Sequence, residues 1–259
     1  MPKDDKSRWR PGGLRRLKVL VSYDGSNFSG WQSQARGDTI QDRLEAALVK
    51  VIGKSIRVHG AGRTDAGVHA LEQCAHVDLP PTRLDPLVLA SALNASLPPA
   101  IRILRCLFVT NAFHARFSAR GKVYRYRIAT TPVLSPFELG RAWHVLGALD
   151  DQSLRDCAGQ FMGTHDFAGF AASRGHPVES TIRTIRRVRV TRSPGITTIE
   201  FEGDGFLYKM VRMMVGASVR CAMGKTTLAE VQTRLADGTL GSPPLVAPAH
   251  GLTLVRVRY

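Results

Sequence analysis

A glycine-rich stretch with one carboxylate and one guanidinium is the part of the sequence best suited to chemistry. Residues 60–70 read GAGRTDAGVHA, which places Arg63 and Asp65 among three glycines. Because glycine adopts backbone conformations closed to other residues, we expect a tight loop between two strands. In one interpretation Asp65 only caps a turn. In the other, the loop presents Asp65 outward beside Arg63, as a nucleophile or general base.

The net charge indicates a polyanionic partner. The chain has 36 Lys and Arg against 21 Asp and Glu, a formal net charge of +15. An excess of this size favours a nucleic acid over a membrane surface. A compositional bias is the alternative, since 28 of the basic residues are Arg. Such a bias exchanges Lys for Arg, however, and does not create net charge.

No residue pattern indicates a metal, a disulfide or a membrane span. The spacing of His59, His69 and His76 fits no common ligand pattern, and no C-x-x-C motif occurs. No apolar run approaches the roughly 18 residues of a transmembrane helix, and the first residues are polar and basic. We therefore expect a cytoplasmic protein without metal. The four cysteines, expected to be buried thiols, are Cys74, Cys106, Cys157 and Cys221.

Hydrophobic periodicity predicts the same order of elements in each half of the chain. In the first half the order is β-α-β-β-α-β, and in the second it is β-α-β-β-α-(α)-β, which is typical of ferredoxin-like units. The first half is predicted from residues 17–23, 40–52, 55–61, 71–79, 86–97 and 101–110. The second is predicted from residues 122–130, 151–162, 182–192, 196–203, 206–223, 227 onward and 251–259.

These elements predict an α+β fold with two ferredoxin-like (βαββαβ) halves, whose antiparallel sheets flank a basic cleft. Residues 1–16 are expected to form a disordered basic arm. Residues 17–113 are expected to form an N-terminal domain that carries the Asp65 loop, and residues 114–259 a C-terminal domain.

Six segments resemble, in the same order along the chain, the tRNA pseudouridine synthases of the TruA type. The loop GRTDAGVHA, which begins at Gly62, is the most specific of them. The others are YDGSNFSGWQ from residue 23, FHARFSA from 113 with YRY from 124, GTHDF from 163, FLYKMVR from 206 and GLTL from 251. Together these segments extend the resemblance over residues 17–259.

The resemblance implies an isomerase of tRNA modification. The family converts uridines 38, 39 and 40 of the tRNA anticodon arm to pseudouridine, works as a homodimer, and uses no metal or other cofactor. Its catalytic aspartate falls on Asp65 and its loop arginine on Arg63. Its base-stacking tyrosine falls on Tyr124, and the helix arginine that pairs with the aspartate falls on Arg212.

The reaction explains why these residue types are needed. The C1′–N1 bond must break and the uracil must rotate before C1′ joins C5. A carboxylate can attack C1′, attack C6, or remove the C2′ proton, and all three routes stay open for Asp65. Tyr124 offers a flat wall for the released base, although a core aromatic is the plain alternative. Arg63 is suited either to hold out the flipped base or to bind phosphate.

Two other functions are compatible with the basic cleft. A non-catalytic RNA-binding protein would keep the charge, but it would not need the Asp65 carboxylate near a polyanion. A related synthase acting on other RNA or other tRNA positions would keep both the positive charge and the Asp65 carboxylate. Arginines 183, 186, 187, 189 and 192 form a basic strand, which indicates either phosphate contacts or a solvated face.

Overall fold

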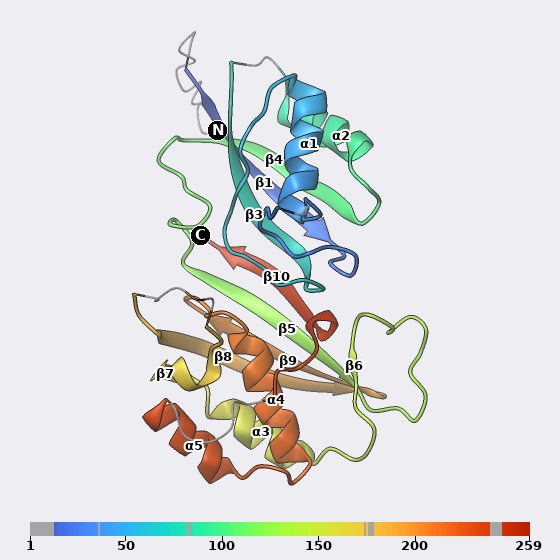
Figure 1. Ribbon diagram of the computed structural model, residues 1–259, viewed down its shortest axis with the longest axis vertical. Coiled ribbons are helices and arrows are strands. Elements are labelled where there is room, and N and C mark those ends of the chain that lie inside the picture. The colour runs from blue at the N-terminus through green and yellow to red at the C-terminus, as the bar shows by residue number, and fades with distance from the viewer. Residues whose placement is uncertain (1–12, 36, 82–83, 174, 176–178, 239–244) are drawn as a thin grey trace, which may run out of the picture.

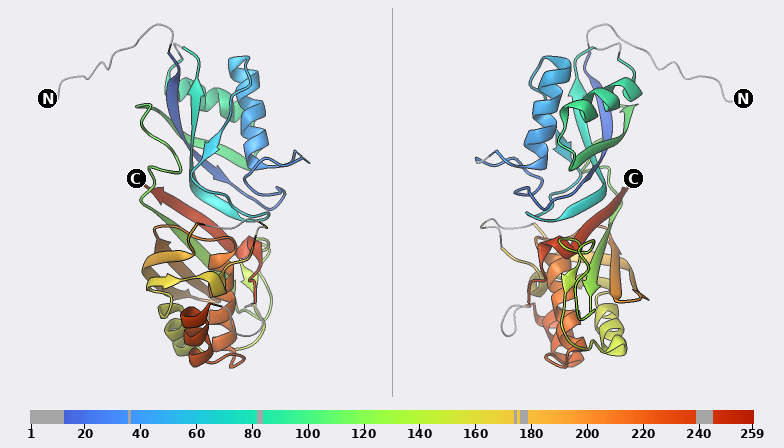
Figure 2. Two further views of the ribbon diagram at one scale, coloured as in Figure 1. Left: turned by 60° about the vertical axis from the view of Figure 1, so that its left-hand side comes forward. Right: turned by 90° about the vertical axis from the view of Figure 1, so that its right-hand side faces the viewer.

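One large sheet connects the two halves of the molecule. The computed structural model describes residues 13–35, 37–81, 84–173, 175, 179–238 and 245–259. Within these ranges, ten mostly antiparallel strands and five α-helices form a mixed α+β fold (Figure 1). The N-terminal half forms one end of an elongated molecule and the C-terminal half the other (Figure 2).

In the N-terminal half, two helices cover one face of an antiparallel group of strands (Figure 1). The hydrogen-bonded order is β4-β1-β3, and β2 pairs with β3 at its other edge. The elements are β1 (Arg15–Tyr23), α1 (Ile40–Ile52), β2 (His59–Gly60), β3 (His69–Leu79), α2 (Pro86–Ser96) and β4 (Ile101–Val109).

The C-terminal half repeats this layering with three helices. Its strand order is β10-β5-β9-β8-β7, and the short β6 pairs in parallel with β5. The strands are β5 (Gly121–Ala129), β6 (Trp143–His144), β7 (Gly163–Asp166), β8 (Ile182–Ser193), β9 (Ile196–Gly203) and β10 (Leu252–Arg258). The helices are α3 (Asp151–Gly159), α4 (Met210–Ala222) and α5 (Leu228–Asp237), with 3₁₀ turns at Ala168–Phe170 and Ala249–Gly251.

The halves join where the last strand returns to the centre of the sheet. Strand β10 pairs antiparallel with β5 and, at Thr253 and Leu254, in parallel with His69 and Ala70 of β3. The two expected sheets are therefore one continuous sheet. Because β3 begins directly after the Asp65 loop, this pairing fixes the end of that loop at the junction.

Several predicted helix ends are confirmed. Thr39 caps α1 by accepting a hydrogen bond from the Asp42 N–H, and Gly53 ends the helix with a left-handed φ of 77°. Asp85 caps α2 in the same way, directly before Pro86. The local sequence was sufficient here because a cap depends on residues within one helical turn.

Other boundaries differ from the prediction. Helix α4 begins at Met210 rather than at residue 206, because Lys209 takes a left-handed φ of 58° and interrupts the helical path. The strand predicted at 55–61 contains only His59–Gly60. Strand β1 begins at Arg15, inside the predicted arm, where Arg16 forms a 2.7 Å ion pair with Asp78. Residues 1–12 of that arm lie outside the described residues.

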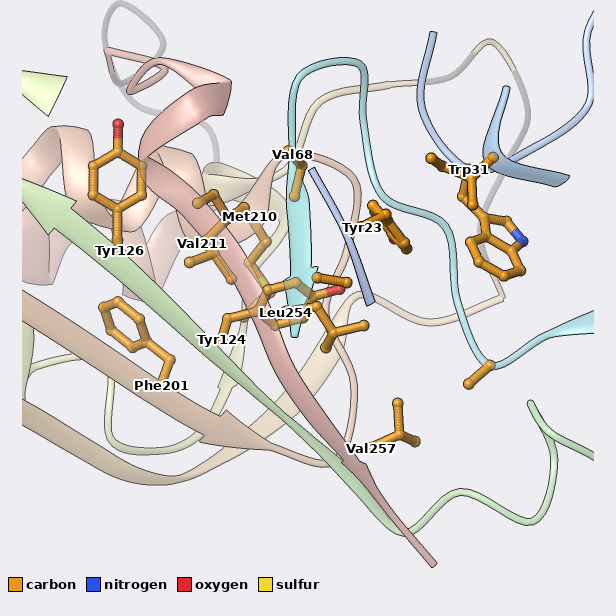
Figure 3. Packing of buried hydrophobic residues seen from close by; sticks show 14 of the residues in the cluster. Tyr23, Trp31, Val68, Tyr124, Tyr126, Phe201, Met210, Val211, Leu254 and Val257 are labelled. Atoms are coloured by element: carbon orange, nitrogen blue, oxygen red, sulfur yellow. The ribbon is translucent and has the colours of Figure 1, made fainter. Parts of the chain in front are cut away.

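Buried side chains pack across the junction as well as within each half. Figure 3 shows Tyr124 of β5 and Leu254 of β10 beside Met210 and Val211 of α4. All four side chains are buried. The apolar contact between α4 and the central strands therefore fixes the start of this helix against the junction. None of the described helices is both long and apolar enough to cross a membrane.

We predict that Gly60→Ala destabilises the protein. A methyl group at this position would lie 2.5 Å from the ring of the buried Trp31. Overpacking of this kind costs about 1–3 kcal/mol of unfolding free energy, measurable by urea denaturation. Gly159→Ala is the matched control, because nothing lies within 4 Å of its added methyl group. Equal stability of the two variants would contradict the packing described here.

Candidate active site

A cavity of about 920 Å³ opens at the junction of the two halves. The loop from Gly60 to Asp65 lines it from the N-terminal half. Strand β5 and the segment from Phe206 to Val211 line it from the C-terminal half. The cavity is large enough for a nucleoside, which makes this the candidate site.

Hydrogen bonds on both sides of Asp65 hold the loop in place. The Val68 N–H donates to the Asp65 carbonyl at 3.1 Å and closes a turn. The Trp31 N–H donates to the Thr64 carbonyl at 3.1 Å, and the Thr64 hydroxyl lies 2.8 Å from the Tyr23 hydroxyl. Residues 23–31 thus form a rigid support beneath the carboxylate, which is the arrangement that a functional loop requires.

Gly30 is needed for this support. Its φ is +92°, and a methyl group there would lie 2.6 Å from the Thr64 carbonyl oxygen. A side chain at this position would strain the backbone and push the Asp65 loop away.

Asp65 and Arg212 form an ion pair between the two halves. Arg212 Nη1 lies 3.2 Å from Asp65 Oδ2, and the two side chains are only 14% and 17% exposed. Arg212 Nε also donates to the Ala247 carbonyl at 2.7 Å, which orients the guanidinium. The pairing expected from the resemblance is thus present, and it aligns a carboxylate on one half with a cation on the other.

Arg63 and Tyr124 line the same cavity as Asp65. Arg63 is exposed, and its Nε donates to the Gln32 side-chain carbonyl at 3.2 Å. Tyr124 is 7% exposed and contacts Phe206 edge to face, with ring centroids 5.1 Å apart. Tyr124 is therefore both a core aromatic and a part of the cavity wall, so the two interpretations of this residue are compatible.

The charge of the cavity lining is strongly positive. Among the described residues that line it, Asp65 is the only carboxylate. Six cationic side chains share the lining: Arg57, Arg63, Arg116, Lys122, Arg183 and Lys209. A lining of this kind attracts a polyanion and leaves a single negative group for chemistry.

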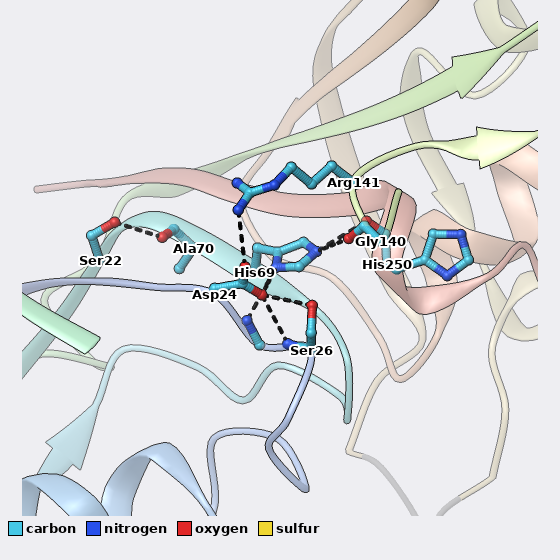
Figure 4. A network of polar contacts seen from close by, with 9 residues as sticks. Ser22, Asp24, Ser26, His69, Ala70, Gly140, Arg141 and His250 are labelled. Carbon is cyan, nitrogen blue, oxygen red and sulfur yellow. Dashed lines mark hydrogen bonds and ion pairs between the residues drawn. The ribbon is translucent and has the colours of Figure 1, made fainter. Parts of the chain in front are cut away.

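A polar network around His69 also ties the halves together, and the sequence analysis missed it (Figure 4). His69 Nε2 lies 2.9 Å from the Gly140 carbonyl and 3.0 Å from the His250 carbonyl. Its Nδ1 accepts the Gly25 N–H at 3.1 Å. Since His69 comes four residues after Asp65, this network fixes the Asp65 loop from its C-terminal side.

Asp24 extends the network to the surface. It pairs with Arg141 at 3.1 Å (Figure 4). Burial of Asp24 opposes its charged form, but hydrogen bonds from Ser26 and the positive charge of Arg141 outweigh it and lower the pKa of Asp24. The aspartate therefore stays ionised at neutral pH and links residues of both halves.

A histidine cluster lies beside the cavity. Ring nitrogens of His59, His76 and His114 come within 4.8 Å of one another, a grouping that their spacing in the sequence did not reveal. His76 Nδ1 accepts the Ala115 N–H at 3.2 Å, and His114 Nδ1 accepts the Arg116 N–H at 3.1 Å. A neutral imidazole bonded in this way carries its proton on Nε2 and offers no lone pair there to a metal. The absence of a metal stays a prediction that this bonding favours.

Comparisons with known proteins find relatives over most of the chain. A family model described as tRNA pseudouridine synthase matches residues 19–118 and 157–259. The chain is similar to proteins named tRNA pseudouridine synthase A from three bacteria. That of Akkermansia muciniphila is 46% identical, over 95% of this chain and 96% of its own length. Those of Solidesulfovibrio magneticus and Methylacidiphilum infernorum are 44% and 40% identical, over 95% and 93% of this chain and 92% and 94% of theirs.

We predict that His76 makes the protein less stable in mild acid. Burial, with the nearby charge of Arg16 and the adjacent imidazoles, lowers the pKa of His76 to about 4. An unfolded histidine titrates near pH 6.5, so between these values only the unfolded chain binds the proton and stability falls as pH is lowered.

His76→Gln should remove this loss, because Gln cannot take up the proton yet can accept the Ala115 N–H. The free energy of unfolding, measured with urea, should fall between about pH 7.5 and 4.5 by on the order of 1–3 kcal/mol less in this variant than in wild type. His165→Gln, at a half-buried histidine outside this cluster, is the control. An unchanged pH dependence in His76→Gln would contradict the buried neutral state.

Proposed function

The chain belongs to the TruA-type family of tRNA pseudouridine synthases, isomerases that modify uridines 38 to 40 of the tRNA anticodon arm, and we propose that Asp65 is its catalytic carboxylate. One observation carries the proposal. Asp65 is the only carboxylate among the described residues of the cavity lining, and Arg212 pairs with it at 3.2 Å.

The reaction rearranges one nucleotide without net gain or loss of atoms. The C1′–N1 bond breaks, C1′ joins C5, the hydrogen on C5 leaves as a proton, and N1 takes up a proton. Asp65 acts on the sugar or the base by one of the three routes given above. Because the uracil is detached in between, the cavity must retain and turn it. A cavity lined from both halves suits this requirement.

Three further residues act on the substrate or on Asp65 in this proposal. Arg212 orients the carboxylate and balances its charge while the sugar or base reacts. Tyr124 stacks against the uracil, an assignment supported by its position on the cavity wall. Arg63, exposed on the same loop as Asp65, fills the space that the flipped uridine leaves in the helical stack.

The proposed organisation has two ferredoxin-like domains, residues 17–113 and 114–259. Strand orders β4-β1-β3-β2 and β10-β5-β9-β8 support it. With the short β6 and β7 left out, each order runs fourth, first, third and second within its half. The active site then lies between the domains, and each domain contributes one member of the Asp65–Arg212 pair.

The proposed assembly is a homodimer in the cytoplasm, as the family resemblance implies. Exposed apolar side chains on one loop support the homodimer, because a partner would cover them. Val133, Phe137 and Leu139 are 80%, 87% and 71% exposed. Neighbouring apolar side chains exposed to this extent are typical of association surfaces.

We predict that Asp65→Asn abolishes turnover and leaves tRNA binding largely intact. The amide keeps the shape of the side chain but is neither a nucleophile nor a base of comparable strength. The assay uses unmodified tRNA transcripts with tritium at uridine C5 and measures tritium released to water. Mapping of the product then identifies the modified positions.

Asp156→Asn is the matched control, since Asp156 is exposed on α3 and does not line the cavity; it should release tritium at the wild-type rate. Normal release by Asp65→Asn would remove Asp65 from the mechanism. Bound RNA without release by the wild type would favour an RNA-binding protein or a different substrate.

A further inference from the structure

Lys122 is a cation of the cavity that the proposed mechanism does not use. It is the second residue of β5, opposite Gly203 of β9 and Val257 of β10. Side chains two apart on a strand share a face, so Lys122 lies on the same face as Tyr124, and both line the cavity. The lysine therefore points towards the site and not towards the outer surface of the sheet.

The ammonium group of Lys122 lies against the loop that carries Asp65. A methyl group on Gly62 would be 2.6 Å from Lys122 Nζ, so the ammonium lies directly against the loop at Gly62. The Gly62 carbonyl accepts a hydrogen bond from the Gln73 side chain at 3.0 Å, which fixes this part of the loop. Lys122 thus lies against Gly62, which precedes the catalytic carboxylate by three residues.

No negative group neutralises Lys122 within the described part of the chain. The hydrogen bonds and ion pairs formed there include none to its ammonium. Asp65, the one carboxylate of the lining, is already paired with Arg212. A partly buried cation without a counter-ion is unfavourable unless a ligand supplies the negative charge.

The groups around Lys122 are mainly positive. Arg116 faces it from the loop before β5, Arg183 from β8, and Arg63 and Asp65 belong to the loop against which it packs. Strands β9 and β10 contribute Gly203 and Val257 at the paired positions, and neither titrates. Burial, followed by the charges of Arg116 and Arg183, lowers the pKa of Lys122 to about 8.

We propose that Lys122, together with Arg116 and Arg183, binds a phosphate of the RNA strand beside the uridine held at Asp65. The proposal rests on the proposed function, because that function brings an RNA strand into the cavity. A phosphodiester matches the site in charge, and all three cations line the same cavity. It also supplies the counter-ion that the protein lacks.

Phosphate binding has a consequence for protonation. Near pH 8 the free protein holds Lys122 partly neutral, whereas a bound phosphate favours the charged ammonium. tRNA binding should therefore weaken as pH rises from about 7 to 9, and a residue that stays charged should not show this loss. Arginine is such a residue, so Lys122→Arg separates this effect from other titrations in the cavity.

The test is equilibrium binding of an unmodified tRNA transcript to wild type, Lys122→Met and Lys122→Arg between about 50 and 200 mM salt. Lys122→Met should bind several-fold more weakly, and the slope of log K against log[salt] should fall by about 0.7–0.9, the loss of one phosphate contact. Lys122→Arg should restore the slope and flatten the pH dependence. Lys225→Met, on an exposed lysine after α4 and outside the cavity lining, should match wild type.

Tritium release at saturating tRNA separates binding from chemistry. The phosphate contact predicts a near-normal rate in Lys122→Met once the tRNA is bound. The proposal would be overturned if Lys122→Met bound tRNA with unchanged affinity and an unchanged salt slope. It would also be overturned if this variant bound tRNA normally but lost its rate of tritium release, because that result would assign Lys122 to chemistry. Wild-type protein that binds tRNA without releasing tritium would overturn the proposed reaction, while the salt slope would still decide the phosphate contact.

Discussion

The ion pair between Asp65 and Arg212 is the constraint on which the rest of the structure depends. A carboxylate with 17% of its side chain exposed is costly to keep charged unless a cation is held beside it. The cation comes from the other half of the chain, 147 residues away. The two halves must therefore meet at one fixed position, and the ladder between β3 and β10 and the His69 network both fix that position.

The same junction reconciles two conflicting requirements. Binding a polyanion requires many cations, whereas the proposed chemistry requires one carboxylate that is not lost to them. Arg212 is oriented by the Ala247 carbonyl and faces Asp65 from the start of α4, while the other cations are distributed around the cavity lining. This division lets the positive charge draw RNA into the site and leaves the Asp65 carboxylate in a defined orientation.

Local features could be read from the sequence, and long-range ones could not. The helix starts at residues 40 and 86 and the tight loop around Asp65 depend on neighbouring residues, so composition and spacing were sufficient. The partner of Asp65 was reached only through the family resemblance, since no local pattern links it to Arg212. Two other features join distant segments and therefore left no periodic signal in the sequence. They are the parallel pairing of β3 with β10 and the grouping of His59, His76 and His114.

The left-handed backbone of Lys209 shows a different reason why a prediction from sequence was wrong. The apolar pattern from residue 206 predicted continuous helix, because periodicity reports burial and not backbone conformation. The structure instead begins α4 at Met210, and residues 206–209 line the cavity. A non-glycine residue with positive φ is costly and tends to occur at functional sites, which agrees with its place beside the cavity.

The most direct test of this account is a double-mutant cycle on the pair itself. The unfolding free energy is measured by urea denaturation for wild type, Asp65→Asn, Arg212→Met and the double variant. The account predicts a coupling energy of about 1–3 kcal/mol, clearly above that of the exposed Arg43–Asp38 pair treated in the same way. Additivity within about 0.3 kcal/mol would mean that the two side chains do not interact, and would contradict the account at its centre.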